Sequence, residues 1–421
     1  MNNKFRNKQL IFLLVLLLIP ILTIAVIAAV LSLRNRLDNE KVKADQLVYN
    51  CEENSLNIDV SMCPNYSNYA NNENANSAVF FNRIIHQANA AKINPVDEII
   101  IKIPAARFYF FKNQNNPQED NAITLLGIYD NLVIEGSSYI ERPTFIDKDQ
   151  NVDKGYLFLA QGGRNLKLKN IIFEGNSKNK YTRALIAIVN TAGNIYVDNI
   201  HCSGTYRDVA NYYLKSNICL QIREHPDYPP SISADYVEVT NSVFKSYDVA
   251  LATSNIKRVN LSNNTFDNTD PCPECVFHHH RGSVSLSSNF TNRDGTSDRS
   301  SISNNIFISN GKVDGQTGIS IVGQSNKIDI TKNILENIQD RAIFVSSHVL
   351  NVDPPCHGGP KDITIVGNTI IGTGTIADGS TIEGISIINQ PATDCNGDIE
   401  KATIRNISIA DNTIKGVKGG G

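Results

Sequence analysis

Several features that define common classes of protein are missing from this sequence. Lys and Arg (39 in total) nearly balance Asp and Glu (42), and the net charge of −3 gives no basic surface for nucleic acid. Tryptophan is absent, and so are the signatures of leucine-rich and propeller repeats. Asparagine is abundant, and 41% of the residues are hydrophobic, which is ample for a core. We therefore expect a protein with a hydrophobic core and no nucleic-acid partner, and any repeat in it must be of a class other than these two.

One short pattern recurs along most of the chain: an extended apolar run, an Asn-rich turn and a second apolar pair. It reads NLKLKNIIFEGN from Asn165 and ISIADNTIKG from Ile407. Successive turns are 22 to 44 residues apart. A short constant unit with insertions of variable length predicts a solenoid, because loops can grow without disturbing the stack. The residues that mark the turns are Asn170, Asn199, Asn241, Asn263, Asn304, Lys332, Gly367 and Asp411.

Each repeat alternates apolar and polar residues, which predicts a short strand with one buried face. Stacked copies bury that face together, whereas a single strand does not. Asn suits the tight corner because it tolerates left-handed backbone angles, and stacked amides can hydrogen-bond between coils. The residues three places past each corner predict an inward stack of Phe173, Cys202, Phe244, Phe266, Phe307, Leu335, Ile370 and Ile414.

Over residues 76–421 this pattern resembles the right-handed parallel β-helix superfamily, which has the pectate-lyase-like or pectin-lyase fold. The predicted fold class is all-β: a right-handed parallel β-helix, or solenoid, with an N-terminal amphipathic capping helix, preceded by a single transmembrane helix. The capping helix is predicted at 77–91, where Val79, Phe80, Ile84, Ile85 and Ala88 form an apolar stripe. The resemblance implies that this helix closes the N-terminal end of the solenoid.

The chain divides into four predicted segments. Residues 1–9 are a short cytoplasmic tail, and 10–33, which carry no charge, are long enough to span a bilayer as a helix. A polar juxtamembrane stalk (34–75) leads to the β-helix domain (76–421), whose end directly after a repeat favours a C-terminally truncated chain. We therefore predict a single-pass membrane protein whose N-terminus lies in the cytoplasm. Its β-helix domain is expected outside the cytoplasm, at the cell surface or in the periplasm. A cleaved signal peptide is the alternative for 10–33.

The eight cysteines agree with an extracytoplasmic, disulfide-permissive location. Cys51 and Cys63 bracket a short loop and are a plausible pair. Cys356 and Cys395 occupy equivalent loops of adjacent coils, so stacking favours a second pair between them. Cys202 falls in the predicted inward stack, which indicates a core thiol.

In polysaccharide-active members of the resembled superfamily, the substrate groove follows a second class of strand, found here at 184–189, 218–223 and equivalent segments. Alternation would point Cys219, Gln221 and Arg223 outward. The predicted catalytic residues along this sheet are Arg223, His225, Asp248 and Arg341. The predicted substrate-binding residues are Gln221, Arg281, Asp340 and His348.

These residues suit a polysaccharide lyase, which must neutralise a uronate carboxylate and place a base near the C5 proton. Diagnostic lyase motifs are absent, as are the Asp-Asp and Gly-His-Gly motifs of polygalacturonases. A hydrolase would need two carboxylates, for which Asp248 and Asp340 are candidates. We predict a membrane-anchored protein that acts on or binds polysaccharide, first as a lyase-like enzyme, less favourably as a glycosidase or epimerase. The alternative function is a non-catalytic glycan-binding or adhesive rod. The alternative interpretation of these side chains is that they are ordinary charged residues on a solvent-exposed sheet.

Two clusters suggest a divalent metal, either Zn²⁺ or Ca²⁺. Cys272 and Cys275 with His278 and His280 have the spacing of zinc ligands, although an extracellular CxxC also forms local disulfides. The segment 147–153 places oxygen side chains at alternate positions, as calcium loops do. It lacks the glycine and glutamate that such loops need, so a plain acidic turn is favoured there.

Overall fold

The computed structural model describes residues 51, 56–92, 94, 96–112, 121–127, 129–149, 153–176, 180–181, 184–205, 218–224, 233–247, 249–269, 281–287, 299–310, 316–323, 325–347, 359–372, 383–389 and 403–417. These residues form a parallel β-helix, so the predicted all-β solenoid fold is confirmed. The predicted segment 10–33 lies outside the described residues. Among the residues that are described, no helix has the length and apolar character needed to cross a bilayer.

Three long sheets run along the β-helix, and all of their strand pairs are parallel. Sheet A contains β1 (Asn57–Asp59), β2 (Ile99–Ile103), β5 (Asp130–Gly136), β9 (Arg164–Lys169), β13 (Ala192–Asp198), β16 (Tyr236–Thr240), β19 (Val259–Ser262), β22 (Ser300–Ser303), β25 (Asn326–Thr331), β28 (Lys361–Val366) and β31 (Arg405–Ala410). Sheet B contains β3 (Arg107–Phe110), β6 (Thr144–Asp147), β10 (Ile172–Glu174), β14 (His201–Thr205), β17 (Val243–Tyr247), β20 (Thr265–Asn268), β23 (Ile306–Ser309), β26 (Ile334–Glu336), β29 (Thr369–Ile371) and β32 (Thr413–Lys415).

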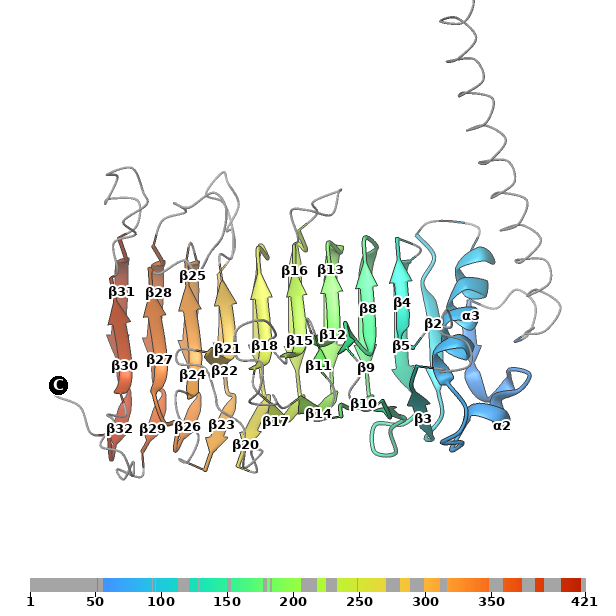
Figure 1. The fold of residues 1–421 in the computed structure, drawn as a ribbon. Coiled ribbons are helices and arrows are strands. Elements are labelled where there is room, and N and C mark those ends of the chain that lie inside the picture. The colour runs from blue at the N-terminus through green and yellow to red at the C-terminus, as the bar shows by residue number, and fades with distance from the viewer. Residues whose placement is uncertain are drawn as a thin grey trace, which may run out of the picture. The chain divides into compact units, whose positions relative to one another are not determined.

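Sheet C is the second strand class predicted from the sequence. Its strands are β4 (Ile123–Leu126), β8 (Phe158–Gln161), β12 (Ala184–Val189), β15 (Ile218–Arg223), β18 (Val249–Ser254), β21 (Arg281–Ser287), β24 (Gln316–Val322), β27 (Arg341–Ser346) and β30 (Glu383–Ile388). Each coil passes through sheet A, a tight corner, sheet B and then sheet C. Figure 1 shows successive coils side by side from the blue to the red end. A small extra sheet pairs β7 (Asp153–Lys154) with β11 (Lys180–Tyr181).

The corners between sheets A and B are where the sequence predicts them. All eight marker residues have left-handed backbone angles, with φ between 50° at Asn199 and 67° at Gly367. Six of the eight are Asn or Asp, the residues that adopt this conformation most readily after glycine. The predicted corners are therefore confirmed, and they explain part of the high asparagine content.

The continuous amide ladder lies one residue after the corner, at positions that point inward. The Nδ2 of Asn264 donates to Oδ1 of Asn305 at 3.0 Å, and the same bond links Asn305 to Asn333, Asn333 to Asn368 and Asn368 to Asn412. Each amide also donates to a backbone carbonyl, as Asn305 does to Leu261 at 3.0 Å. Because these side chains are buried, this pairing removes the penalty for unmet polar groups.

The predicted inward stack is confirmed as far as Ile370, whereas its last member, Ile414, is 41% exposed. Strand register aligns Phe173, Cys202, Phe244, Phe266 and Phe307 in sheet B. All five are fully buried. The rings of Phe244 and Phe266 stack at 5.1 Å, and those of Phe266 and Phe307 stack at 4.6 Å. Burial of such rings is a main apolar contribution to the stability of the fold.

The N-terminal end is covered by the predicted helix, α3 (Ser77–Ala90). Its N-cap, Asn76, accepts a hydrogen bond from Ala78 N at 3.2 Å. Phe81 packs against Phe108 and Phe145, with ring centroids 4.9 and 5.1 Å apart. Four of the five predicted stripe residues are buried, whereas the fifth, Val79, is half-buried and Phe81 takes its place in the apolar face.

Sheet A begins earlier than predicted. β1 pairs with β2, and it is followed by η1 (Val60–Met62) and α2 (Tyr66–Tyr69). These elements lie inside the segment predicted as a polar stalk. The predicted Cys51–Cys63 disulfide is confirmed and closes the loop beside β1. This segment is ordered because β1 pairs with the edge of β2. The hydropathy pattern of the sequence does not reveal that pairing.

Candidate functional site on sheet C

The outer face of sheet C is identified by its register. Gly318 and Gly384 face inward, since a Cβ on them would lie 2.8 Å from Leu335 and 3.0 Å from Ile414 in sheet B. Residues one position earlier and two positions later therefore face outward. The first outer row is Ala184, Ile218, Val249, Gly282, Thr317, Arg341 and Glu383. The second is Ala187, Gln221, Ala252, Ser285, Ser320, Phe344 and Ser386.

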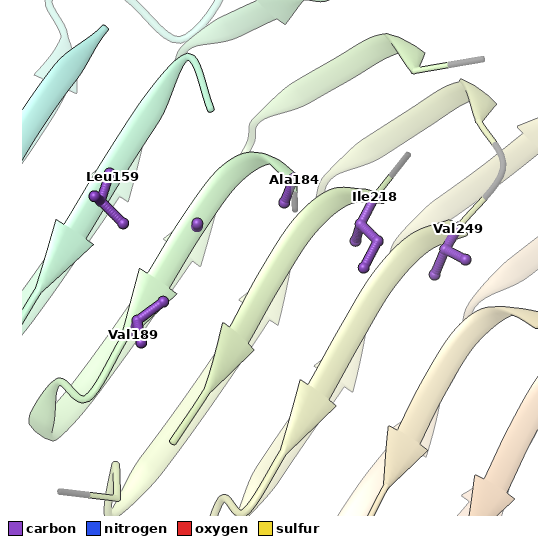
Figure 2. Close-up of a cluster of buried hydrophobic side chains, with 6 residues drawn as sticks. Leu159, Ala184, Val189, Ile218 and Val249 are labelled. Atoms are coloured by element: carbon purple, nitrogen blue, oxygen red, sulfur yellow. The ribbon is translucent and has the colours of Figure 1, made fainter. Parts of the chain in front are cut away.

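The first coils present an apolar outer face. Figure 2 shows Ala184, Ile218 and Val249 side by side at the starts of three neighbouring strands, with Leu159 and Val189 in the same cluster. Each of these five side chains is at most 6% exposed. In these coils the face predicted to hold substrate is thus lined by buried apolar side chains.

Cys219 was predicted to point outward with Gln221 and Arg223, and this prediction is wrong. Cys219 is fully buried and shares its register with the inward positions Leu185 and Ala250. Simple alternation therefore does not hold at the start of this strand. Gln221 and Arg223 do lie in the outer rows and are partly exposed.

Charged groups gather at the starts of β27 and β30, beside Thr317 at the start of β24. Arg341 Nε lies 2.9 Å from Glu383 Oε2, and Arg341 Nη1 lies 3.5 Å from Asp340 Oδ2. Thr317 Oγ1 contacts the same Asp340 oxygen at 3.4 Å. The guanidinium lies over the Phe344 ring at 4.7 Å. We call Thr317, Asp340, Arg341, Phe344 and Glu383 the Arg341 cluster.

The Arg341 cluster is only partly open to solvent. The side chain of Arg341 is 13% exposed and that of Asp340 18%, whereas Glu383 is 38% exposed. Thr317 is buried and Phe344 is 6% exposed. Partial desolvation strengthens the attraction between the guanidinium and the two carboxylates, and the aromatic face fixes the plane of the guanidinium.

Small inward residues position this cluster. A Cβ on Gly318 would lie 2.5 Å from the Ala342 carbonyl oxygen, so glycine lets β24 approach β27 closely at this point. The register then sets Thr317 beside Arg341 and Arg341 beside Glu383. Three side chains from three coils meet as a consequence.

The predicted site residues do not all meet. Asp340 and Arg341 lie together, but Arg223 and Gln221 are on β15, four strands away from β27. At about 4.8 Å per strand this is a separation of about 19 Å along the sheet. Gln221 Oε1 is buried and has no hydrogen-bond partner among the described residues. The backbone of Arg281 pairs with Gln316, two strands from Asp340.

Several predicted residues lie outside the described residues: His225, Asp248, His348, Cys272, Cys275, His278, His280, Cys356 and Cys395. Their roles stay predictions. Within the described part of the chain, no group of three or more His, Cys, Asp or Glu has the arrangement of a metal site. Of the acidic turn, Asp147 and Asp149 are buried. Asp149 Oδ1 accepts from Lys112 N at 2.7 Å, and Asp147 Oδ1 accepts from Asp149 N at 3.1 Å.

Sequence reasoning missed Thr317, Phe344 and Glu383. Glu383 is the first residue of its strand as Arg341 is of its own, and this equivalence was the available signal. Thr317 and Phe344 carry no chemical signature of their own. Only register with Arg341 identifies them.

A second polar surface lies on the outer face of sheet A. Tyr196 and Tyr236 meet edge to face at 5.9 Å, and Arg258 lies over the Tyr236 ring at 5.1 Å. Asn260 Nδ2 donates to Tyr236 Oη at 3.3 Å, and Ser301 Oγ donates to Asn260 Oδ1 at 2.7 Å. Burial raises the pKa of the Tyr236 phenol, while its hydrogen bond with Asn260 lowers it, and the net shift is upward. We call these five residues the tyrosine row.

No family model matches the sequence, and no curated protein sequence matches it. Among solved structures, the chain is similar to the A-module of the mannuronan C-5 epimerase AlgE4 from Azotobacter vinelandii, with 11% identity and a TM-score of 0.34 over 85% of this chain and 97% of that one. It is also similar to PfbA, a surface adhesin of Streptococcus pneumoniae, with 12% identity and a TM-score of 0.36 over 85% and 92%. A family 28 exopolygalacturonase from Yersinia enterocolitica has 9% identity and a TM-score of 0.27 over 84% and 78%.

Proposed function

We propose that this β-helix acts on an acidic polysaccharide as a lyase-like enzyme, with the Arg341 cluster as its charged centre. The observation that supports the proposal is the convergence of Asp340, Arg341 and Glu383 within hydrogen-bond distance on the outer face of sheet C. An enzyme that handles uronates needs a cation for the substrate carboxylate and a neighbouring base for the C5 proton.

In this proposal Arg341 pairs with the substrate carboxylate. A guanidinium has five N–H donors, so it can hold Glu383 through Nε and still bind an anion in its plane. Glu383 is the more exposed carboxylate and can exchange for a uronate. Asp340 then orients the guanidinium. His225 and Asp248 stay predictions for the base.

The test is an assay of the full chain against uronate polysaccharides. It reads the absorbance of unsaturated products and the release of reducing ends, with and without a chelator. We expect unsaturated ends, and we expect Arg341→Ala to lower their rate by about 100-fold or more, as loss of an aligned charge does. The chelator arm tests the predicted Ca²⁺ or Zn²⁺ requirement.

Arg299→Ala is the matched control. Arg299 also makes an ion pair between coils, with Asp329, but on sheet A. Equal rates for the two variants would contradict a role for the Arg341 cluster. Reducing ends without unsaturated ends would indicate a glycosidase instead, with Asp340 as one of its carboxylates.

The tyrosine row favours a second function, the glycan-binding rod. Partly exposed tyrosines next to hydrogen-bonding side chains offer sugar rings both apolar faces and polar contacts. If the protein binds polysaccharide without changing it, Tyr196→Ala and Tyr236→Ala should weaken retention on an immobilised polysaccharide, whereas Arg341→Ala should not. Retention unaffected by both tyrosine substitutions would contradict this function.

We further propose that residues 10–33 anchor the chain in a membrane, with the β-helix outside the cytoplasm. The first support is that this segment of 24 residues carries no charge and is long enough to span a bilayer. The second is the Cys51–Cys63 disulfide, since disulfides persist in oxidising compartments. Carbonate extraction of membranes from cells producing the full chain is the test. A chain recovered in the carbonate-soluble fraction would contradict the anchor.

A further inference from the structure

Two thiols meet inside the solenoid, in the coil formed by β13, β14 and β15. Cys202 lies on β14 in sheet B, and Cys219 lies on β15 in sheet C. Both side chains are fully buried, and Cys219 lies near enough to contribute to the raised pKa of Cys202. Strands β14 and β15 pack against each other within a single coil, which brings the two buried positions to the same part of the interior.

The packing around Cys202 makes room for this contact. Register places Cys202 between Phe173 and Phe244 in the inward stack. Ring contacts continue from Phe173 to Phe145, and from Phe244 to Phe266, on either side of this coil. A cysteine is much smaller than phenylalanine, and Cys219 fills part of the space that a ring would take.

Cys219 stands where neighbouring coils have Leu185 and Ala250. This position is inward in β15, as it is in the neighbouring strands, and Cys202 is buried in the same interior. Burial and the neighbouring thiol raise the pKa of Cys202 far above its ordinary value, so in the closed coil it is held as the thiol. Oxidation therefore has to occur while the coil is open, during folding.

We propose that Cys202 and Cys219 form a disulfide that joins sheet B to sheet C across the core. The chain already forms one disulfide, between Cys51 and Cys63, so the conditions in which that bond forms also allow this one. The oxidant is a disulfide such as oxidised glutathione. One cysteine thiolate attacks it and releases one glutathione thiol, and the second cysteine then displaces the other, so two thiols are oxidised while one disulfide is reduced.

Refolding of the full, reduced chain with and without a glutathione redox mixture tests the proposal. After alkylation and tryptic digestion without reductant, Cys202 lies in the peptide 184–207 and Cys219 in the peptide 216–223. We expect these two peptides to appear linked, lighter than their sum by two hydrogen atoms. The Cys51–Cys63 linkage in the same digest is the positive control.

Cys219→Ala is the matched variant, because alanine is the native residue at the equivalent position of the next coil, Ala250. The bond closes a loop of about 17 residues and should raise the thermal midpoint by roughly 5 °C. Oxidation forms the Cys51–Cys63 bond in both chains, so the midpoint should rise by roughly 5 °C more in the parent chain than in the variant.

Recovery of both peptides in alkylated form, with Cys51 and Cys63 linked, would overturn the proposal. So would a link from Cys202 or Cys219 to any other cysteine. If oxidation raised the thermal midpoint of Cys219→Ala as much as that of the parent chain, the gain would come from the Cys51–Cys63 disulfide and the proposal would be wrong.

Discussion

The first and last coils of this β-helix fill the same interior in different ways. Around α3 the core is aromatic, with Phe81, Phe108 and Phe145 in contact. The inward position after the corner is apolar in these coils, Ile171 and Ile200. From Asn264 onward the same position is an amide in every described coil, buried as far as Asn368 and half-buried at Asn412. Between the two regions stands Ser242, whose Oγ accepts from Ile200 N.

This difference shows that one backbone geometry accepts two kinds of core. In the first coils stability comes from apolar area, which tolerates changes of volume poorly. In the last coils the side-chain amides hydrogen-bond to one another and to the backbone at the corner. The hydrogen bonds of each amide therefore depend on the amides in the neighbouring coils. Damage to the aromatic region should therefore stay local, and damage to the ladder should spread to adjacent coils.

The largest expected effect is on the aromatic side of the comparison. Phe81→Ala removes a ring that contacts Phe108, Phe110 and Phe145, and the cavity should lower the unfolding free energy by about 3–5 kcal/mol. Chemical denaturation measures the loss. Tyr139→Ala, at a side chain that is 61% exposed, is the control and should change stability little.

A ladder substitution should come next. Asn305→Ala leaves Asn264 N and the Leu261 carbonyl without their partner, and each unmet buried group costs about 1–3 kcal/mol. Hydrogen exchange should rise in the coils on both sides of β23. Asn412→Ala, at a half-buried member of the ladder, should cost less because water can reach it. Exchange confined to one coil would refute the coupling along the ladder.

Substitutions at the corners between sheets A and B should have a weaker effect, and they should raise the stability of the protein instead of lowering it. Lys332 has a left-handed φ of 55°, whereas the equivalent residue of the next coil is Gly367 at 67°. A side chain disfavours this conformation, so Lys332→Gly should stabilise the protein by about 1 kcal/mol or less. A thermal melt detects the shift. Asn304→Gly should gain less, since Asn already tolerates the angle.

The smallest effect concerns pH and belongs to the first region. Burial, Arg142 and Lys245 lower the pKa of His201 below its ordinary 6.5, although Asp267 opposes them. The unfolded chain then binds a proton more readily than the folded one, so stability present above pH 6.5 falls as the pH drops toward the folded pKa. His201→Gln should flatten this slope in denaturation curves measured between pH 7.5 and about 5.5. His86→Gln, at an exposed residue, should keep it.

Parts of the candidate site could be read from the sequence and others could not. Asp340 and Arg341 lie at the start of a strand of sheet C, and their place on its outer face follows from alternation. Arg223 has the same kind of position but lies on β15, about 19 Å from β27, because three strands stand between them. Loop lengths in the sequence do not reveal which coils bring their charges together.

What the sequence determined by itself is the repeat: left-handed corners at the Asn-rich turns, alternating strands, an inward row of large apolar residues and a helix over the first coil. These follow from local preferences that each residue carries anywhere in a chain. Tertiary structure alone decided the inward turn of Cys219, the position of the amide ladder and the meeting of Thr317, Arg341 and Glu383. Each of these depends on register between strands 20 or more residues apart, and no local preference encodes that register.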